Sequence, residues 1–359
     1  MQDPTASSRP TPDQIRAFRA ENPGMRERDI AARLGISEAE LVAADVGFTA
    51  TRIIADPATL LAHAEAFGEI MALSRNDSAV HEKIGVFENI RSGARASIVL
   101  GENIDLRIFP NRWAYGFAVA KTDKDGNEKL SLQYFDRSGT AVFKLHLRPG
   151  SNLDAYRSFV TDARLDDQSR IFTAEAVTPH DSEFERNPDA VDVEVLRGRW
   201  AAMTDTHQFF GMLSDMKLHR QTALESVGTD YAEELAPDAV TEMFKRAATQ
   251  PDLPIMAFVA NSGIVQIHSG PVSNIVEMGP WINVMDPTFH LHLRRDHITR
   301  AFLVRKPTAD GHVTSVEAFD AEGGMIIQFF GKRQEGFAER PAWRDLVENL
   351  PRLKATAAA

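Results

Sequence analysis

The sequence predicts an α+β protein built by tandem duplication of one domain that combines helices with an antiparallel β-sheet. Three observations support this prediction. The chain has 359 residues, which is more than one compact core usually holds. Short runs of alternating apolar and polar residues, separated by Gly, Asn and Asp turns, are typical of antiparallel strands. The third observation is an internal repeat that covers this strand-rich region.

The first part of the chain, up to about Ala72, is expected to be mainly helical. Thr11 and Gln14 have the spacing of a capping box at the start of a helix. The stretch from Arg28 to Leu41 has the apolar spacing of a small helix-turn-helix, a motif that also occurs in DNA-binding regulators. The formal net charge of −11 disfavours nucleic acid as a partner. We therefore expect these helices to cap the first domain.

From about Ala72 to Arg148 the pattern changes to that of strands. The runs ASIVL, IDLRIF, YGFAVAK, LSLQYF and AVFKLHL each end at a turn signal. An acidic, proline-containing stretch follows and is predicted to be a linker over residues 176–194. It separates an N-terminal repeat, residues 1–175, from a C-terminal repeat, residues 195–359.

The repeat is found by shifting the sequence against itself by 185 positions. FAVAKTDKDG, which begins at Phe117, then aligns without a gap with FLVRKPTADG, which begins at Phe302. At a shift of 184, Phe135, Asp136 and Gly139 align with Phe319, Asp320 and Gly323. Positions where the halves differ are candidates for a task that only one half performs. His81 aligns with Gln266, and Arg107 aligns with His292.

Composition excludes several kinds of chemistry. The chain has no cysteine, so disulfides, iron–sulfur clusters, thiolate-ligated haem and covalent c-type haem are excluded. The polar, proline-rich N-terminus does not have the apolar core of a secretory signal, and no later run approaches a membrane span. We expect a cytoplasmic protein without membrane insertion.

His207, in the segment AMTDTHQFFGMLSDMKLHR, is the strongest candidate for a functional side chain. Thr204 or Asp205 can cap a helix that carries this histidine in its first turn. The positive end of the helix dipole there favours the neutral imidazole, the form that donates a ring nitrogen to iron. Apolar neighbours such as Phe209 and Phe210 suit a porphyrin face. Taken by itself, this pattern is also that of a helix cap or a core residue.

Several cationic and polar side chains accompany this histidine. Lys217 and Arg220 lie just beyond the predicted helix, and Arg pairs well with a carboxylate such as a haem propionate. In MIIQFFGKR the strand period places Gln328 and Phe330 on one side, with Arg333 at the strand's end. A polar Gln between apolar neighbours requires a partner, which is either a ligand, a water or another side chain. A solvated cationic surface remains the alternative for Lys217 and Arg220.

Two weaker patterns were also considered as ligand sets. His290 and His292 share one face of a predicted strand, with His297 nearby, a spacing compatible with a metal pair. No local carboxylate or cysteine completes that set, so a structural role is favoured. Methionines near His207 offer sulfur ligands, but methionine at helical spacing is usually core filling.

Long segments of the chain resemble the cytoplasmic haemin-degrading and haem-trafficking proteins of the HemS, ChuS, PhuS and HmuS type. These segments are NPGMRERDIAARLGISEAEL, SAVHEKIGVFENI, NIDLRIFPNRWA, WAAMTDTHQFF, PWINV, RKPTADGHVTS and WRDLV. The resemblance covers nearly the whole chain. It implies a tandem duplication of a domain with a large antiparallel β-sheet flanked by helices, and haem held in a cleft of the C-terminal half.

The resemblance also implies roles for single residues. His207 is the proximal iron ligand, and Arg107 reaches into the distal side of the same site, so both are implied to act in catalysis. The implied propionate-binding and cleft positions are Lys217, Arg220, Lys306, Arg333 and Gln328. His81 resembles a histidine proposed as a ligand for a second haem in the N-terminal half of some members. Family members often have tyrosine two residues after the cleft glutamine, where this chain has Phe330.

Two functions use the same predicted pocket. The first is degradation of haem to a linear tetrapyrrole with release of iron. Since no G-x-G-x-x-G fingerprint for a nicotinamide or flavin occurs, an external donor, such as a partner reductase, would supply the electrons. The second is a non-enzymatic chaperone that accepts haem from an inner-membrane importer and delivers it to a separate haem oxygenase. A DNA-binding regulator is a third hypothesis, and it would require salt-dependent binding to duplex DNA.

Overall fold

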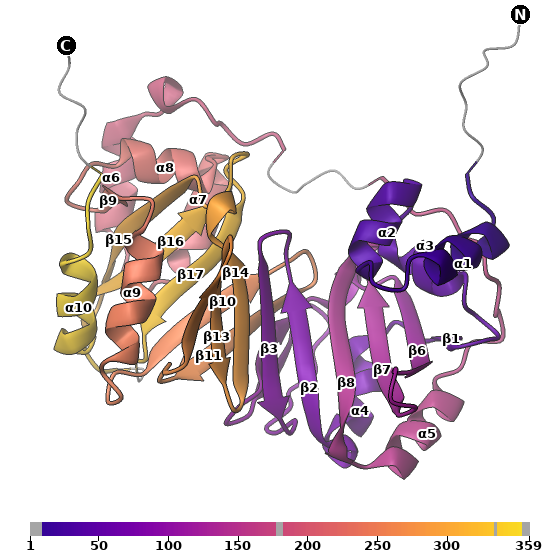
Figure 1. Cartoon of the computed structure of the whole chain (residues 1–359). Coiled ribbons are helices and arrows are strands. Elements are labelled where there is room, and N and C mark those ends of the chain that lie inside the picture. The colour runs from indigo at the N-terminus through magenta and orange to yellow at the C-terminus, as the bar shows by residue number, and fades with distance from the viewer. Residues whose placement is uncertain (1–8, 177–181, 334–335, 354–359) are drawn as a thin grey trace, which may run out of the picture. The chain divides into compact units, whose positions relative to one another are not determined.

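The computed structural model describes residues 9–176, 182–333 and 336–353 (Figure 1). Its contacts divide the chain into two compact units. Unit 1 comprises Met1–Arg75, Lys83–Val177 and Asn261–Val265, and unit 2 comprises Asn76–Glu82, Thr178–Ala260 and Gln266–Ala359. Each unit therefore contains most of one half of the sequence and a short segment from the other half. The predicted domain limits, 1–175 and 195–359, stay predictions.

Unit 1 contains helices at both ends of its sequence and strands between them. Its helices are α1 (Pro12–Glu21), α2 (Glu27–Leu34), α3 (Glu38–Ala43), α4 (Pro57–Ala64) and α5 (Leu153–Asp162), with 3-10 turns η1 (Glu65–Phe67) and η2 (Pro110–Arg112). Its strands are β1 (Ala50–Ile53), β2 (Gly68–Arg75), β4 (Ser97–Leu100), β5 (Asp105–Ile108), β6 (Tyr115–Thr122), β7 (Glu128–Phe135) and β8 (Ala141–Ser151). Two further strands, β3 (Ala79–Gly85) and β11 (Ile264–Gly270), have residues in both units.

Unit 2 repeats this order of elements. Its helices are α6 (Val193–Ala201), α7 (Gln208–Met216), α8 (Arg220–Ser226), α9 (Ala239–Ala248) and α10 (Pro341–Glu348), with 3-10 turns η3 (Pro188–Ala190) and η4 (Arg295–His297). Its strands are β9 (Ala232–Leu235), β10 (Ile255–Ala260), β12 (Ile275–Met278), β13 (Trp281–Asp286), β14 (Phe289–Arg294), β15 (Arg300–Thr308), β16 (Gly311–Phe319) and β17 (Met325–Gly331).

The strand order confirms the predicted duplication. Unit 1 has the order β1-β6-β7-β8-β2, and unit 2 has the equivalent order β9-β15-β16-β17-β10. The strand pairs described in these orders are antiparallel. The turns η2 and η4 begin at Pro110 and Arg295, which is the predicted shift of 185. The α+β fold class and the tandem repeat of an antiparallel sheet with helices are therefore confirmed.

The repeated Phe-Asp-x-x-Gly motif forms the same turn in both units. In unit 1 the Asp136 carboxylate accepts from the backbone N–H of Ser138, and Gly139 has a φ of 74°. In unit 2 Asp320 accepts from the backbone N–H of Glu322, and Gly323 has a φ of 79°. Glycine adopts this left-handed conformation without strain, so the motif recurs because both turns need the same backbone.

A repeated asparagine attaches each exchanged segment to its unit. In unit 2 the amide of Asn76 donates to the carbonyl of Ile326 at 2.7 Å. In unit 1 the amide of Asn261 donates to the carbonyl of Val142 at 2.8 Å. Both asparagines also accept from backbone N–H groups two and three residues later. The two amides therefore satisfy equivalent backbone groups, which explains why asparagine occurs at both positions.

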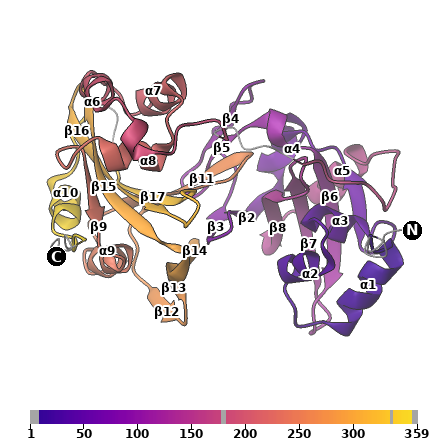
Figure 2. The ribbon, with the colours of Figure 1, turned by 90° about the horizontal axis from the view of Figure 1, so that it is seen from above.

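Helices cover both faces of the main sheet of unit 2 (Figure 2). Phe302 and Val304 of β15 pack with side chains of α6, α7 and α8 in one apolar cluster. Ala301 and Leu303 point the other way and pack with α9 and α10 in a second cluster. This alternation is the period of two expected for a strand buried on both faces. Side chains at even positions of β15, including Lys306, accordingly face α7.

In unit 1 the predicted capping box of α1 is confirmed, because Thr11 and Gln14 bond each other's backbone N–H groups. The α1–α3 helices share one small apolar cluster, and α3 also packs on Phe117 and Phe135 of the sheet. This arrangement agrees with the expected helical cap. Helices dominate up to about Ala72, as expected, although β1 and the start of β2 also lie in that stretch and pair with distant strands.

Part of the predicted linker, residues 177–181, lies outside the described residues. Within the described ranges, no helix has the length and apolar character needed to cross a bilayer.

Candidate functional site

The turn before α7 holds His207 in place through a local network. One carboxylate oxygen of Asp205 accepts from the backbone N–H of His207 at 2.8 Å. The side-chain oxygen of Gln208 accepts from the backbone N–H groups of Thr204 and Asp205 at 2.8 and 3.3 Å. The helix begins at Gln208 with His207 as its N-cap. The predicted cap by Thr204 or Asp205 was therefore wrong, and Asp205 instead closes the turn that precedes the helix.

The same carboxylate orients the imidazole. The Nδ1 atom of His207 lies 2.7 Å from Oδ1 of Asp205. A carboxylate only accepts hydrogen bonds, so Nδ1 carries the proton and the neutral ring has its lone pair on Nε2. The His207 side chain is 92% exposed. A histidine whose Nδ1–H is held by a carboxylate while Nε2 is accessible has the arrangement of a metal-ligating histidine.

Charge around Asp205 supports this orientation. The backbone and side-chain hydrogen bonds from His207 lower the pKa of Asp205 below its usual value, and the positive charge of Arg333 adds to that effect. Asp205 is therefore ionised at neutral pH and acts as an acceptor for the ring. Arg333 follows β17 and is partly exposed, and its charge acts on Asp205 in the turn before α7.

One face of α7 is both exposed and flat. Phe210 and Gly211 lie three and four positions after His207, so the three residues share a helix face. Phe210 is 69% exposed, and apart from its chain neighbours and the backbone of its own helix, no described atom lies within 4 Å of the position a Cβ of Gly211 would occupy. The opposite face buries Phe209 and Leu213. An exposed aromatic ring beside a glycine offers a flat apolar surface to a planar ligand.

Gly211 is not among the residues predicted from the sequence. It lies four residues after His207, and this spacing places both residues on one face of a helix that begins near His207.

Lys217 ends α7 in a left-handed conformation with a φ of 47°. This conformation is unusual for a residue with a side chain. The backbone carbonyl of Lys217 accepts from the N–H of Glu185 at 2.7 Å, which helps to hold the turn. The lysine side chain is exposed, and it lies at the opposite end of the helix from His207.

A buried carboxylate that the sequence analysis missed binds two of the predicted cations. Arg220 donates from Nε and Nη2 to the two oxygens of Glu317, both at 2.8 Å. Lys306 donates from Nζ to Oε1 of Glu317 at 2.5 Å. The side chain of Glu317 is 0% exposed and that of Lys306 is 3% exposed. The sequence signal was present, because Glu317 has the strand parity of Ser315 and Phe319, but burial of a glutamate is not expected from pattern alone.

The burial of this cluster changes the acidity of its members. Burial alone would raise the pKa of Glu317, but the charges of Arg220 and Lys306 hold it well below its usual value. Burial lowers the pKa of Lys306 to about 8, and this lowering is opposed by Glu317. Lys306 is therefore charged at neutral pH but close to its titration range.

Phe209 connects the ion cluster to the helix that carries His207. The centre of its ring lies 4.9 Å from the guanidinium carbon of Arg220 and 4.7 Å from Nζ of Lys306. Cations at these distances are attracted by an aromatic ring. Since Phe209 is two residues from His207, the cluster fixes the start of α7 against the sheet.

Gln328 and Phe330 lie on β17 beside the ion cluster. Gln328 is directly opposite Glu317 in the β16–β17 ladder. In the amide orientation that suits its neighbours, the oxygen of Gln328 accepts from Nη2 of Arg220 at 2.5 Å. The ring of Phe330 lies 5.7 Å from Nζ of Lys306. The structure thus brings Arg220, Lys306, Gln328 and Phe330 together in unit 2.

Arg107 lies on β5 of unit 1. Its guanidinium forms an ion pair with Asp105 and also donates to the carbonyl of Leu106 at 3.2 Å. Burial raises the pKa of Asp105, and Arg107 opposes this effect. The side chain of Arg107 is 34% exposed.

His81 is fully buried in β3. Its ring centre lies 5.0 Å from that of Phe289. The ring of His268 also stacks on Phe289, with the two ring centres 3.8 Å apart. A role of His81 in binding a second haem stays a prediction, and such a role requires this packed region to open.

The other histidines considered as ligands contact separate partners. Nδ1 of His290 lies 3.1 Å from Glu82, that of His292 lies 2.7 Å from Asn283, and that of His297 lies 2.9 Å from Ser78. Among the described residues, no group of three or more His, Cys, Asp or Glu is arranged to hold a metal ion. These contacts agree with the favoured structural role.

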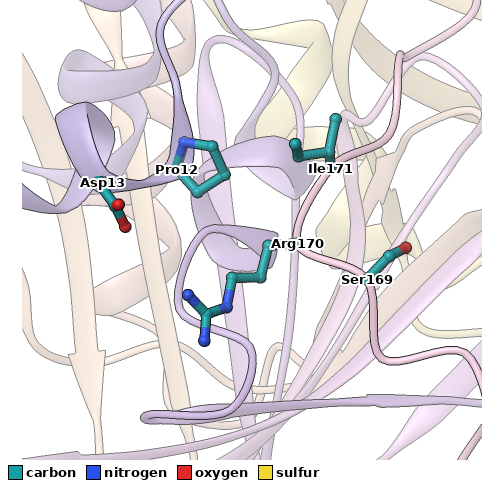
Figure 3. Close-up of a pocket in the computed structure, with 5 residues that line it drawn as sticks. All are labelled: Pro12, Asp13, Ser169, Arg170 and Ile171. Atoms are coloured by element: carbon teal, nitrogen blue, oxygen red, sulfur yellow. The ribbon is translucent and has the colours of Figure 1, made fainter.

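Figure 3 shows a surface hollow of unit 1 lined by Pro12, Asp13, Ser169, Arg170 and Ile171. None of the predicted site residues lines it. The hollow lies where α1 meets the segment after α5, and it is separate in sequence from every predicted haem-site residue.

The chain thus has two tandem copies of one α+β domain, and the second carries an accessible, carboxylate-oriented histidine and a buried ion cluster. The chain matches the Haemin-degrading HemS.ChuX domain over residues 35–163 and 217–350. It belongs to this family.

Full-length relatives agree with that assignment. The Hemin transport protein HemS of Yersinia enterocolitica is 37% identical over 94% of this chain and 96% of the relative. A crystal structure of holo-PhuS, a haem-binding protein from Pseudomonas aeruginosa, is similar with a TM-score of 0.91 and 39% identity, over 96% of this chain and 100% of PhuS. The haem-degrading enzyme ChuS of Escherichia coli O157:H7 is similar with a TM-score of 0.86 and 36% identity, over 93% and 97% of the two chains.

The ion cluster predicts an acid-sensitive stability. Because the pKa of Glu317 is lower in the folded protein than its usual 4.5, its contribution is present above that pH and is lost as pH falls below it. We expect Glu317→Gln to lower the free energy of unfolding by about 3 kcal/mol at pH 7 and to flatten the loss of stability below pH 4.5. Urea unfolding between pH 3 and pH 7 measures both effects.

Glu322→Gln is the matched control, since it removes one carboxylate from an exposed turn of the same unit. Equal acid dependence in the wild-type and Glu317→Gln proteins would contradict the role assigned to this ion cluster.

Proposed function

We propose that this protein binds haem with His207 as the proximal iron ligand and degrades it to a linear tetrapyrrole with release of iron. The observation that carries the proposal is the accessible imidazole of His207, whose Nδ1–H is held by Asp205. This leaves Nε2 as the donor to iron. The relatives support haem as the ligand, because PhuS is described as haem-binding, HemS as a hemin transport protein and ChuS as haem-degrading.

The proposed ligand contacts match the parts of haem. The exposed face of Phe210 and Gly211 suits the apolar macrocycle, and the cations Lys217, Arg220, Lys306 and Arg333 suit its propionates. Gln328 and Phe330 belong to the sheet face that carries Lys306. A phenylalanine at position 330 contributes apolar area but no hydroxyl, so it donates no hydrogen bond to a water or to a propionate.

We assign Arg107 to the distal side of the haem, on the family resemblance. A guanidinium there would supply hydrogen-bond donors beside the iron, and such donors decide between storage and activation of the ligand. The reaction consumes O2 and needs electrons from an external donor, for which a partner reductase is the proposed source. We further propose that the protein acts in the cytoplasm and receives haem from an inner-membrane importer.

A haem chaperone is the second candidate function. The name of HemS refers to transport, and the high exposure of His207 suits transfer of the ligand to an acceptor. In this case the protein would deliver intact haem to a separate haem oxygenase.

A haemin titration followed by absorbance tests the ligand assignment. We expect His207→Ala to weaken binding by about tenfold or more and to change the ferric spectrum, because the iron loses its axial nitrogen. Arg107→Ala should bind haemin with near wild-type affinity. His63→Ala, which removes a histidine of α4 in unit 1, is the control and should match the wild type. If His207→Ala also matches the wild type, the site is misassigned.

Removal of the Asp205 charge tests how His207 is oriented. Asp205→Asn keeps an oxygen that accepts from the ring but removes the negative charge, so the imidazole becomes a weaker donor to iron. We expect haemin affinity to fall by about tenfold and the iron–histidine stretching frequency of the ferrous complex to decrease in resonance Raman spectra. An unchanged frequency would exclude Asp205 as the partner of the ligating ring.

Addition of a reductant to the haem complex in air separates the two functions. Catalase is included to remove free peroxide, and a ferrous chelator reports released iron. Loss of the Soret band, with a linear tetrapyrrole found by mass spectrometry, is expected for the enzyme. Arg107→Ala should slow this loss by about tenfold or more while leaving affinity unchanged. A stable ferrous complex in the wild-type protein would instead establish the chaperone.

A further inference from the structure

The two most buried cations proposed to bind haem carboxylates are both occupied by Glu317. Its Oε1 atom accepts from Lys306, from Nη2 of Arg220 and from the hydroxyl of Ser315, at 2.5, 2.8 and 2.9 Å. Its Oε2 atom accepts from Nε of Arg220 at 2.8 Å. An internal carboxylate thus holds the donors that a ligand carboxylate would use.

The charges of this cluster do not cancel. Lys306 and Arg220 carry two positive charges, and Glu317 supplies one negative charge. Two cations in a buried site are unfavourable without a counter-ion, so Glu317 stabilises the site when no ligand is present. One net positive charge remains for an incoming carboxylate. Because the Arg220 side chain is 20% exposed and Lys306 only 3%, the incoming group meets Arg220 first.

In unit 1 a neutral side chain occupies the equivalent position of the sheet. At the repeat shift of 184, Gln133 of β7 corresponds to Glu317, and Ser131 corresponds to Ser315. Gln133 is buried, and its amide donates to the hydroxyl of Ser131 at 3.1 Å. Lys121, which corresponds to Lys306 at the shift of 185, pairs instead with Glu27 of the helical cap. The equivalent sheet of unit 1 therefore has a neutral amide where unit 2 has Glu317.

We propose that Glu317 is an internal counter-ion that competes with the carboxylates of the bound ligand for Arg220 and Lys306, and so limits ligand affinity. This inference rests on the proposed function. When a propionate binds, Glu317 gives up hydrogen bonds to Arg220, and the propionate takes them. When the ligand leaves, Glu317 restores the pairing, so neither cation is ever left without an acceptor. Glu317 is a positioning residue, because it acts on the ligand through the two cations.

The protonation of Lys306 adds a pH dependence to this competition. The charged groups that face Lys306 are Glu317 from β16 and Arg220 from α8, while α7 and β17 present Phe209 and Phe330. Burial holds the pKa of Lys306 at about 8, and Glu317 opposes further lowering. Without Glu317, Lys306 loses its proton at lower pH. Ligand binding then requires uptake of a proton, so affinity falls as pH rises.

The test uses the full-length chain and two probes, haemin and haemin dimethyl ester, in which both propionates are esterified. At pH 6 we expect Glu317→Gln to bind haemin about tenfold more tightly than the wild type, the effect of about one charge-assisted hydrogen bond. The ester should bind both proteins equally, because it brings no carboxylate. Affinity and dissociation rate are measured by absorbance, with an apo-globin as the haem acceptor.

The same variants are compared from pH 6 to pH 9.5. We expect the affinity of Glu317→Gln for haemin to fall more steeply with pH than that of the wild type. The double variant Glu317→Gln with Lys306→Arg should not show this steep fall, since an arginine stays protonated across the range. Glu322→Gln is the control for the loss of one negative charge from unit 2, and it should match the wild type with both probes.

The inference is overturned if Glu317→Gln binds haemin no more tightly than the wild type, or if the ester shows the same change as haemin. If Glu317→Gln does not fold, Glu317→Asp replaces it. Its shorter side chain draws the carboxylate away from the cations, and a smaller increase in affinity is expected. If the wild type binds haemin through His207 and Glu317→Gln has no effect on affinity, only this inference is contradicted. If the wild type does not bind haemin, the proposed function is contradicted as well.

Discussion

The buried carboxylate of Glu317 is the interaction on which the C-terminal site depends. A charge without a partner is strongly unfavourable in a protein interior, and Glu317 compensates the charges of Arg220 and Lys306 beneath α7. The guanidinium of Arg220 and the ammonium of Lys306 in turn lie over the ring of Phe209. Phe209 anchors the first turn of α7, and this anchors the histidine that precedes it. The start of α7 thus packs on an ion cluster of the sheet, while Asp205 and Gln208 hold the turn that carries His207.

Duplication has produced one scaffold with two chemical specialisations. In unit 2 the counter-ion for the lysine comes from a neighbouring strand, through Glu317. In unit 1 the equivalent strand position is Gln133, and the counter-ion of Lys121 comes from helix α2 through Glu27. The conserved elements are those that the sheet itself needs, namely the Phe-Asp-x-x-Gly turns and the paired asparagines. Positions that face the covering helices are free to differ, because each unit is covered by different helices.

Much of the fold was predictable because its signals are local or repeated. The strand runs, the capping box of Thr11 and Gln14 and the shift of 185 all involve neighbouring residues or a constant register. The helix start at Gln208 was misplaced, because Thr204, Asp205 and His207 all suit a position near a helix start, and only the hydrogen bonds distinguish them. Strand β1 was not predicted, because its pairing partner β6 is distant in sequence.

The sequence by itself determined the duplication, the α+β class and the candidacy of His207, since all three depend on order and spacing along the chain. Only the tertiary structure decided how the candidates are charged and held. Glu317 lies 97 residues from Arg220 and 11 from Lys306 along the chain, and nothing in its neighbours distinguishes it from an exposed strand glutamate. Its effect arises from burial, because removal of water makes two distant cations and one carboxylate depend on each other. Burial is a property of the packed sheet and helices, and no stretch of sequence contains it.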